Sequence, residues 1–123
     1  MPETPIISPA TIHNLRALSP DDNDEFLREI VGIFELDTPE RLAELEKALA
    51  DADNKTFARA AHSIKGSSAN VGAMKLHALA QELEAMASVG DKKAMQASLL
   101  RARSEFAQAT AELHRITQSA PNS

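Results

Sequence analysis

The stretch Ala61-His62-Ser63-Ile64-Lys65-Gly66-Ser67-Ser68-Ala69-Asn70-Val71-Gly72 decides the fold that we expect for this chain. On a helical wheel with about 100° per residue, His62 points directly away from an apolar stripe. That stripe consists of Phe57, Ala60, Ile64 and Val71. Asp53 is a favourable N-cap, and helices commonly end at residues such as Asn70 and Gly72. The sequence therefore predicts a helix from about Asp53 to Asn70, with His62 on its exposed face.

The face of this helix that carries His62 includes small and cationic residues, namely Ala58, Arg59, Lys65, Gly66 and Ala69. A glycine in a helix interior costs about 1 kcal/mol relative to alanine, and close approach of a second protein is one reason to keep it. Lys65 and Arg59 lie three residues to either side of His62 and place two cations near anything attached to the ring. An exposed imidazole in these surroundings suits a group that accepts and passes on a phosphoryl group. An ordinary surface histidine and a packing glycine are the alternatives.

The composition predicts a single all-α domain with an aliphatic core. A chain of 123 residues is long enough for one domain and too short for two. It has four Phe, no Trp, no Tyr and no Cys, so disulfides and thiolate metal sites are not available to it. No apolar run approaches the ~18 residues of a membrane span, and the N-terminus lacks a signal-peptide core. We therefore expect a soluble, cytoplasmic protein that does not enter a membrane.

Charge is distributed unevenly along the chain. The net charge of −5 argues against nonspecific nucleic-acid binding. The segment 54–81 nevertheless has no Asp or Glu and four cations, which are Lys55, Arg59, Lys65 and Lys75. This basic segment coincides with the motif that contains His62.

Cap residues and apolar periodicity predict the helices that precede the motif. We expect a flexible tail over residues 1–7. Ser8-Pro9 begins a short helix with apolar positions at Ile12, Leu15 and Leu18. Ser19-Pro20-Asp21-Asp22 repeats that start signal, with acids placed to suit the helix dipole. The helix that follows has its predicted core face at Phe26, Leu27, Ile30, Ile33 and Phe34.

Thr38-Pro39 interrupts this second helix and allows two interpretations. Thr38 is suited to cap a new helix with Pro39 in its first turn and with Leu42, Leu45 and Leu49 on its core face. Alternatively, one long helix, kinked at Pro39, continues to near Asp51.

Two further helices follow the motif helix. The first has core positions at Leu76, Leu79, Leu83 and Met86 and ends at Gly90. Asp91 caps the second, whose core positions are Met95, Leu99, Ala102, Phe106, Ala109, Leu113 and Ile116. Residues 118–123 form a predicted flexible tail. Short connections favour antiparallel neighbours, so residues 8–117 predict an up-down-up-down antiparallel four-helix bundle with a short extra N-terminal helix.

The pattern His-x-x-Lys-Gly-x-Ser at residues 62–68, followed by Gly72, resembles the signature of histidine-containing phosphotransfer (HPt) domains of bacterial phosphorelays. The helix lengths and apolar stripes resemble this family over nearly the whole chain, which favours the single kinked helix at Pro39. The resemblance implies that His62 Nε2 accepts a phosphoryl group from an aspartyl phosphate of a receiver domain and passes it to another. The implied partners are response-regulator receiver domains and a hybrid sensor histidine kinase, and we expect a monomer.

A nucleophilic Nε2 requires that Nδ1 keep its proton and donate it to an acceptor. Glu84 lies 22 residues after His62, where some family members place a Glu or Gln that bonds this ring. Gln81, one turn earlier on the same face, is the alternative acceptor. Lys65, and less directly Arg59, are expected to offset the charge of the phosphoryl group. Ala58, Gly66 and Ala69 would provide room for the partner.

The absence of several sequence motifs argues against some classes of function. The chain has no phosphate-binding Gly-rich loop and no kinase motif, so we expect a phosphorelay intermediate that is not itself an enzyme, with no cofactor of its own. The magnesium ion that drives transfer would belong to the receiver partner. None of the four histidines has a Glu three residues before it, which argues against a di-iron bundle. A receiver-binding adaptor that carries no phosphate remains the alternative function.

Overall fold

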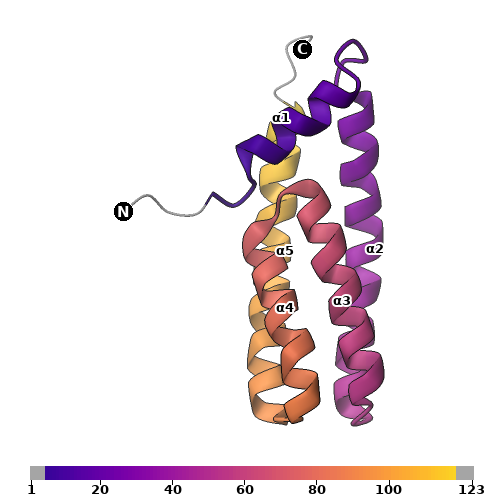
Figure 1. Ribbon diagram of the computed structural model, residues 1–123, viewed down its shortest axis with the longest axis vertical. Helices are drawn as coiled ribbons and strands as arrows, with labels where there is room; N and C mark the ends of the chain where they lie inside the picture. The colour runs from indigo at the N-terminus through magenta and orange to yellow at the C-terminus, as the bar shows by residue number, and fades with distance from the viewer. Residues whose placement is uncertain (1–4, 119–123) are drawn as a thin grey trace.

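The computed structural model describes residues 5–118, which form five helices and include no strand. The helices are α1 (Pro9–Leu18), α2 (Glu25–Ala50), α3 (Asn54–Val71), α4 (Met74–Val89) and α5 (Lys92–Gln118). Figure 1 shows α2 to α5 along the long axis of the molecule, with α1 across one end. The turn between α3 and α4 lies at the α1 end, and the other two turns between long helices lie at the opposite end. The predicted all-α class is confirmed, and a four-helix bundle with an added N-terminal helix is consistent with this arrangement.

The four long helices enclose one core. α2 packs against α3 and α5, and α4 packs against the same two helices. Each long helix contributes at least one fully buried large side chain, among them Phe34, Phe57, Leu83 and Leu113. The rings of Phe34 and Phe106 pack with their centroids 5.3 Å apart. Burial of each such side chain stabilises the fold by about 1.5–3 kcal/mol, so the core fixes which face each helix turns outward.

Helix α3 begins and ends where the sequence predicts. The Asp53 carboxylate caps it by accepting a hydrogen bond from the backbone N–H of Thr56 at 3.1 Å. Gly72 ends it with a φ of +80°, a conformation that favours glycine. A Cβ at this glycine would lie 2.9 Å from Thr11 Cβ, because α1 packs directly against the turn. Ser8 N–H also donates to the Gly72 carbonyl at 2.8 Å, which attaches the start of α1 to the end of α3.

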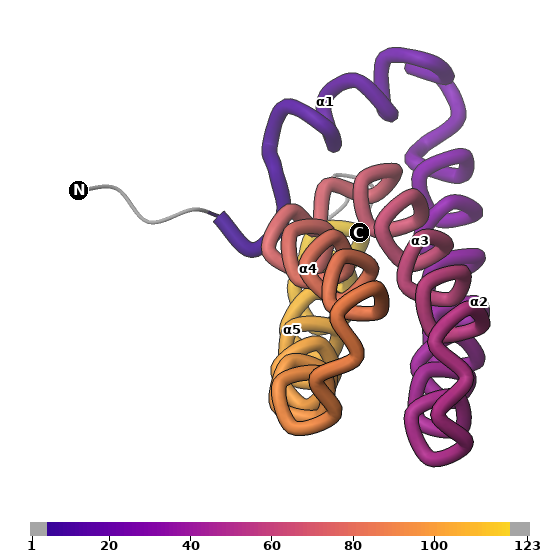
Figure 2. Tube along the Cα trace, turned by 60° about the horizontal axis from the view of Figure 1, so that its bottom comes forward, coloured from indigo at the N-terminus to yellow at the C-terminus, as the bar shows by residue number. Residues whose placement is uncertain are grey.

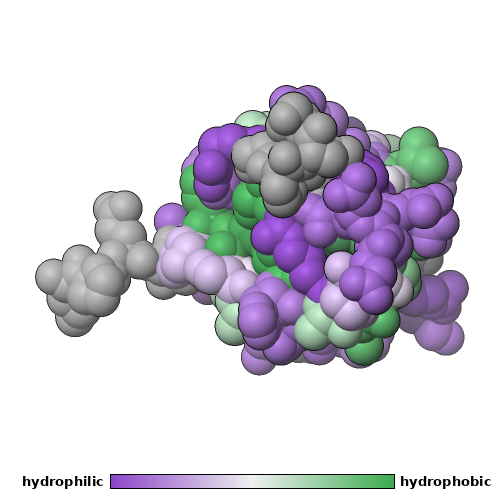
Figure 3. Space-filling view, turned by 90° about the horizontal axis from the view of Figure 1, so that it is seen from above, coloured by the Kyte–Doolittle hydropathy of each residue, from purple (hydrophilic) through white to green (hydrophobic). Residues whose placement is uncertain are grey.

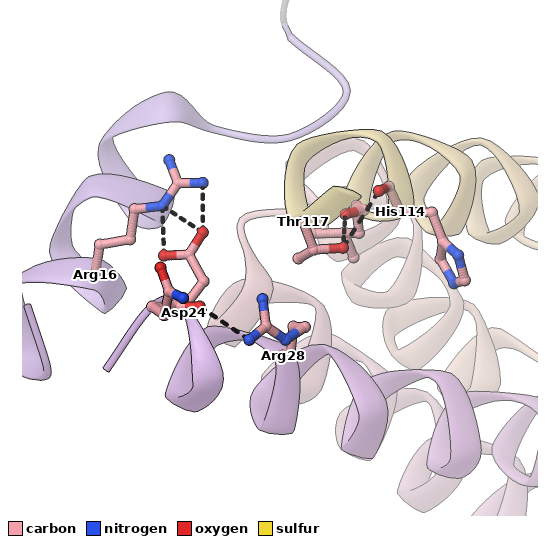
Figure 4. Close-up of polar contacts among 7 residues, drawn as sticks. Arg16, Asp24, Arg28, His114 and Thr117 are labelled. Atoms are coloured by element: carbon pink, nitrogen blue, oxygen red, sulfur yellow. Dashed lines mark hydrogen bonds and ion pairs between the residues drawn. The ribbon is translucent and has the colours of Figure 1, made fainter. Parts of the chain in front are cut away.

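The start predicted for the second helix is wrong by several residues. α2 begins at Glu25, after a connection in which Asn23 and Asp24 both have positive φ angles. Arg16 Nε and Nη2 donate to the two carboxylate oxygens of Asp24 at 3.0 and 2.9 Å, and Arg28 donates to the Asn23 carbonyl at 2.9 Å (Figure 4). Asp22, one of the two acids that we interpreted as first-turn residues, lies before the helix and accepts a hydrogen bond from the Phe26 N–H at 2.9 Å.

Pro39 lies inside a single helix, so the interpretation of one long helix is confirmed. The missing N–H is tolerated because the buried stripe continues through it at Phe34, Thr38 and Leu42. Thr38 is fully buried in that stripe and caps no helix. The stripe also corrects one predicted core position, because Val31 is buried whereas Ile33 is 62% exposed. Ile33 is rotated about 100° from Phe34 and faces away from the core.

Two further expectations are wrong at the end of the molecule near α1. Ile7 is buried and Ile6 packs against the core, so these residues do not belong to a flexible tail. Leu18, predicted to face the core, is 70% exposed at the last turn of α1. Residues 1–4 and 119–123 of the two predicted tails lie outside the described residues, and Gln118 is the last residue of α5.

Figure 2 shows α1 crossing the end of the bundle where α3 turns into α4. Seen from this end, hydrophilic residues cover most of the surface and apolar ones show between them (Figure 3). Within residues 5–118, none of the helices has the length and apolar character that a membrane span requires.

Candidate functional site

The site centres on His62, in the middle of α3. Its side chain is 65% exposed, whereas Phe57, Ala60 and Ile64 on the opposite face are at most 3% exposed. The core therefore holds α3 in a rotation that presents the imidazole to the outside.

Glu84 on α4 joins the imidazole to a cation. Its Oε2 lies 3.1 Å from His62 Nδ1, and its Oε1 accepts a hydrogen bond from Lys65 Nζ at 2.9 Å. The side chains of Lys65 and Glu84 are 27% and 33% exposed. One carboxylate thus bridges two residues of α3 that are one turn apart, and all three side chains are partly open to solvent.

The charge of Glu84 determines the tautomer of the ring. The hydrogen bond from Lys65 is the main cause that lowers the pKa of Glu84 below its ordinary value, against the opposing effect of partial burial. Attraction to Lys65 and the contact with His62 lower this pKa further. At neutral pH the carboxylate is therefore ionised and only accepts hydrogen bonds. His62 Nδ1 must then be the donor, which in the neutral ring leaves the lone pair on Nε2.

His114 on α5 provides a contrast within the same chain. Its Nε2, and not its Nδ1, lies 2.7 Å from Glu35 Oε1 on α2. Its Nε2 therefore faces the carboxylate and is not free for a partner. Both imidazoles are exposed beside an acid, but of these two only His62 keeps Nε2 free of it.

The surface next to His62 is open. A Cβ added at Gly66 would have no neighbouring atom within 4 Å beyond the helix itself. Ala58 and Ala69 are half-buried and add only methyl groups to this face. At Gly66 there is therefore room beside the helix.

Two other predicted site residues take no part in the described polar contacts of the ring. Arg59 and Gln81 are exposed, and neither forms a described hydrogen bond or ion pair with His62. Arg59 borders a groove between α2 and α3 together with Arg41 and Ser63. The structure thus brings together His62, Lys65 and Glu84 and leaves Arg59 and Gln81 at the margin. Between the two possible acceptors of the Nδ1 proton, it is Glu84 that lies against Nδ1.

His77 is a residue to which sequence reasoning assigned no role. Its Nδ1 lies 2.9 Å from the backbone carbonyl oxygen of Lys65, and its side chain is half-buried between α4 and α3. Its sequence spacing from Gln81 and Glu84 places it on the same face of α4, which was the one available signal. Residues 5–118 hold no group of three or more His, Cys, Asp or Glu side chains arranged to bind a metal ion.

Comparison with known proteins identifies the family. The model of the Hpt domain family matches residues 29–119, a range that covers most of the chain and contains the whole site. The chain belongs to the Hpt family. This Hpt chain is similar to histidine-containing phosphotransfer protein B (HptB) from Pseudomonas aeruginosa PAO1, known from a crystal structure. The two are 29% identical, with a TM-score of 0.85 over 95% of this chain and 98% of that one.

A comparison with the curated proteins finds no match. The family match and the structural similarity together make the chain a histidine phosphotransfer protein of a phosphorelay, and they confirm the resemblance drawn from the motif.

Proposed function

We propose that His62 is the phosphoacceptor of this Hpt protein and that it exchanges a phosphoryl group with receiver domains. The observation that carries this proposal is the contact between Glu84 Oε2 and His62 Nδ1 at 3.1 Å on an exposed ring. It directs the Nδ1 proton toward Glu84 and the Nε2 lone pair toward a partner.

The reaction exchanges one bond to phosphorus for another. His62 Nε2 attacks the phosphorus atom of an aspartyl phosphate on the receiver, and the N–P bond forms as the P–O bond of the mixed anhydride breaks. The aspartate leaves as a carboxylate, and the phosphorylated ring keeps its Nδ1 proton, which stays hydrogen-bonded to Glu84. The reverse sequence of bonds passes the phosphoryl group to the aspartate of a second receiver.

Lys65 has two tasks in this account. In the free protein its ammonium holds Glu84 ionised and in place, through the contact of 2.9 Å. Once the phosphoryl group arrives, Lys65 offers a cation one turn from His62 along α3. Arg59 is the second cation of this face, and its exposed side chain is available to the acidic surface of a receiver.

The partners follow from the chemistry of the site. A receiver domain supplies the aspartyl phosphate, the acidic pocket and the magnesium ion, and a hybrid sensor histidine kinase starts the relay. Ala58, Gly66 and Ala69 admit the receiver, with Arg59 and Gln81 at the rim. This protein then acts as a monomeric cytoplasmic intermediate with no cofactor or kinase activity of its own, and it uses neither nucleic acid nor membrane.

The topology that we propose for the bundle supports this arrangement. An up-down-up-down antiparallel order of α2 to α5 places α3 and α4 as direct neighbours, joined by a two-residue turn at Gly72 and Ala73. His62 and Glu84, which lie about equally far from this turn on either side, then come to the same level of the bundle.

Phosphate transfer from a labelled receiver tests the proposal against the adaptor alternative. The wild-type protein and the variants His62→Gln and His114→Gln are incubated with a phosphorylated receiver, and circular dichroism checks that each variant is folded. We expect label on the wild-type protein and on His114→Gln, and none on His62→Gln. A wild-type protein that binds the receiver but takes up no label would establish the adaptor function instead.

A further inference from the structure

His77 contacts the backbone of Lys65, and the side chain of Lys65 in turn binds Glu84. A backbone carbonyl can only accept a hydrogen bond, so His77 Nδ1 is the donor in its contact of 2.9 Å with the Lys65 carbonyl. The same Lys65 donates its side-chain Nζ to Glu84 Oε1 at 2.9 Å. Lys65 is therefore joined to α4 at two points, once through its backbone and once through its side chain.

These two points are separated by seven residues of α4, or about 10 Å along the helix axis at 1.5 Å per residue. Two attachments at this spacing fix both the rotation of α4 and its position along α3. The ammonium of Lys65 sits on a flexible stem of four carbons and cannot do this alone. The imidazole of His77 is rigid beyond two torsions and bonds to the backbone itself, so it is the firmer of the two attachments.

We propose that His77 is a positioning residue for phosphoryl transfer. It holds α4 against the carbonyl of Lys65 so that Glu84 stays within hydrogen-bond distance of His62 Nδ1. The effect of His77 on the tautomer of His62 does not depend on the function proposed above, whereas its effect on the transfer rate rests on that function.

Removal of His77 leaves no unpaired carbonyl behind. The Lys65 carbonyl also accepts a hydrogen bond from Ser68 Oγ at 3.2 Å. The remaining core contacts of α3 and α4 involve other residues, such as Ile64, Leu76 and Leu83, which are at most 1% exposed. Variants at His77 should therefore fold, and their effects at His62 can be measured.

Three substitutions separate a positioning role from a merely structural one. His77→Asn keeps an N–H donor close to the place of Nδ1, His77→Gln moves that donor one bond further out, and His77→Leu removes it. Nitrogen-15 NMR reports the tautomer of His62, the initial rate of labelling from a phosphorylated receiver reports transfer, and thermal unfolding reports stability. His114→Leu serves as a control outside the site.

We expect His77→Leu and His77→Gln to move the nitrogen-15 shifts of His62 toward those of a free imidazole. Transfer should slow by about twofold to tenfold, the range that the net free energy of one hydrogen bond gives. His77→Asn and His114→Leu should resemble the wild-type protein. Unchanged His62 shifts in both His77→Leu and His77→Gln would overturn the proposal. If His77→Leu does not fold, the comparison of Asn with Gln gives the same answer.

The assignment of His62 as the phosphoacceptor is tested separately. Label that persists in His62→Gln would contradict that assignment. The nitrogen-15 measurement does not involve phosphate, so it still tests the role of His77 in that case.

Discussion

Lys65 Nζ and Glu84 Oε1 lie 2.9 Å apart across the interface of α3 and α4, and this contact leaves Oε2 of the same carboxylate for His62. When a carboxylate lies beside a histidine with no other charged group nearby, the shared proton can reside on either the carboxylate or the ring. The ammonium of Lys65 lowers the pKa of Glu84 further below neutral pH and so favours the ionised carboxylate, which leaves the proton on the ring. Lys65 thus supports the tautomer of His62, although it contacts the other oxygen of Glu84.

Removal of Lys65 should raise the pKa of Glu84 toward its ordinary value. A carboxyl group whose pKa is lowered in the folded protein contributes stability above the pKa of the unfolded chain, and this contribution is lost as the pH falls through the folded value. Acid should therefore protonate Glu84 at a lower pH in the wild-type protein than in Lys65→Met. Carbon-13 NMR of the Glu84 carboxyl during an acid titration measures this, with Lys75→Met as the control. An identical Glu84 titration in Lys65→Met and the wild-type protein would contradict the ion pair.

Removal of Glu84 should release the tautomer of His62. In Glu84→Ala the Nδ1 proton has no carboxylate acceptor, so nitrogen-15 NMR should show the mixture of tautomers of a free imidazole. Transfer from a phosphorylated receiver should slow by about tenfold or less, because a hydrogen bond to a charged group is weakened here by solvent exposure. Gln81→Ala, on the same face of α4, should leave the tautomer of His62 unchanged. If Gln81→Ala disturbs His62 and Glu84→Ala does not, the acceptor has been assigned to the wrong residue.

Gly66 should accept a methyl group without harm to the fold. Nothing lies within 4 Å of the added Cβ, so Gly66→Ala should stabilise α3 by up to about 1 kcal/mol, as chemical denaturation would show. Gly66→Gln should keep the fold but slow transfer, because its longer side chain occupies the space for the receiver. Gly72→Ala is the matched control, since its φ of +80° and the close Thr11 Cβ predict a loss of stability. Normal transfer by a destabilised Gly66→Gln would mean that this glycine serves packing.

Local signals predicted most of the fold. Ser8, Asp53 and Asp91 each accept a hydrogen bond from the N–H three residues later, and Gly72 and Gly90 end helices with positive φ angles. These features depend on a few neighbouring residues, which is why the sequence alone is enough to find them. The apolar repeat of α5 and the exposed position of His62 follow from helical periodicity in the same way.

The errors come from contacts between segments. The connection before α2 has two residues with positive φ, held by Arg16 from a different helix, and no local pattern announces that pairing. Ile33 and Val31 are equally apolar, and the packing of α2 against two neighbours decides which of them is buried. The candidate site shows the same difference between features that follow from local sequence and features that depend on contacts between segments. The spacing of His62 and Glu84 suggested their contact, whereas the bond from His77 to a backbone carbonyl depends on the rotation of one helix against another.

The position of the phosphoryl group on the intact protein tests the central claim most directly. After transfer from a phosphorylated receiver, a phosphorus–proton correlation NMR spectrum of the folded Hpt protein assigns the phosphorylated nitrogen. The account predicts a single phosphorylated site, Nε2 of His62, with the Nδ1 proton retained. A phosphoryl group on His62 Nδ1, or on His13, His77 or His114, would contradict it.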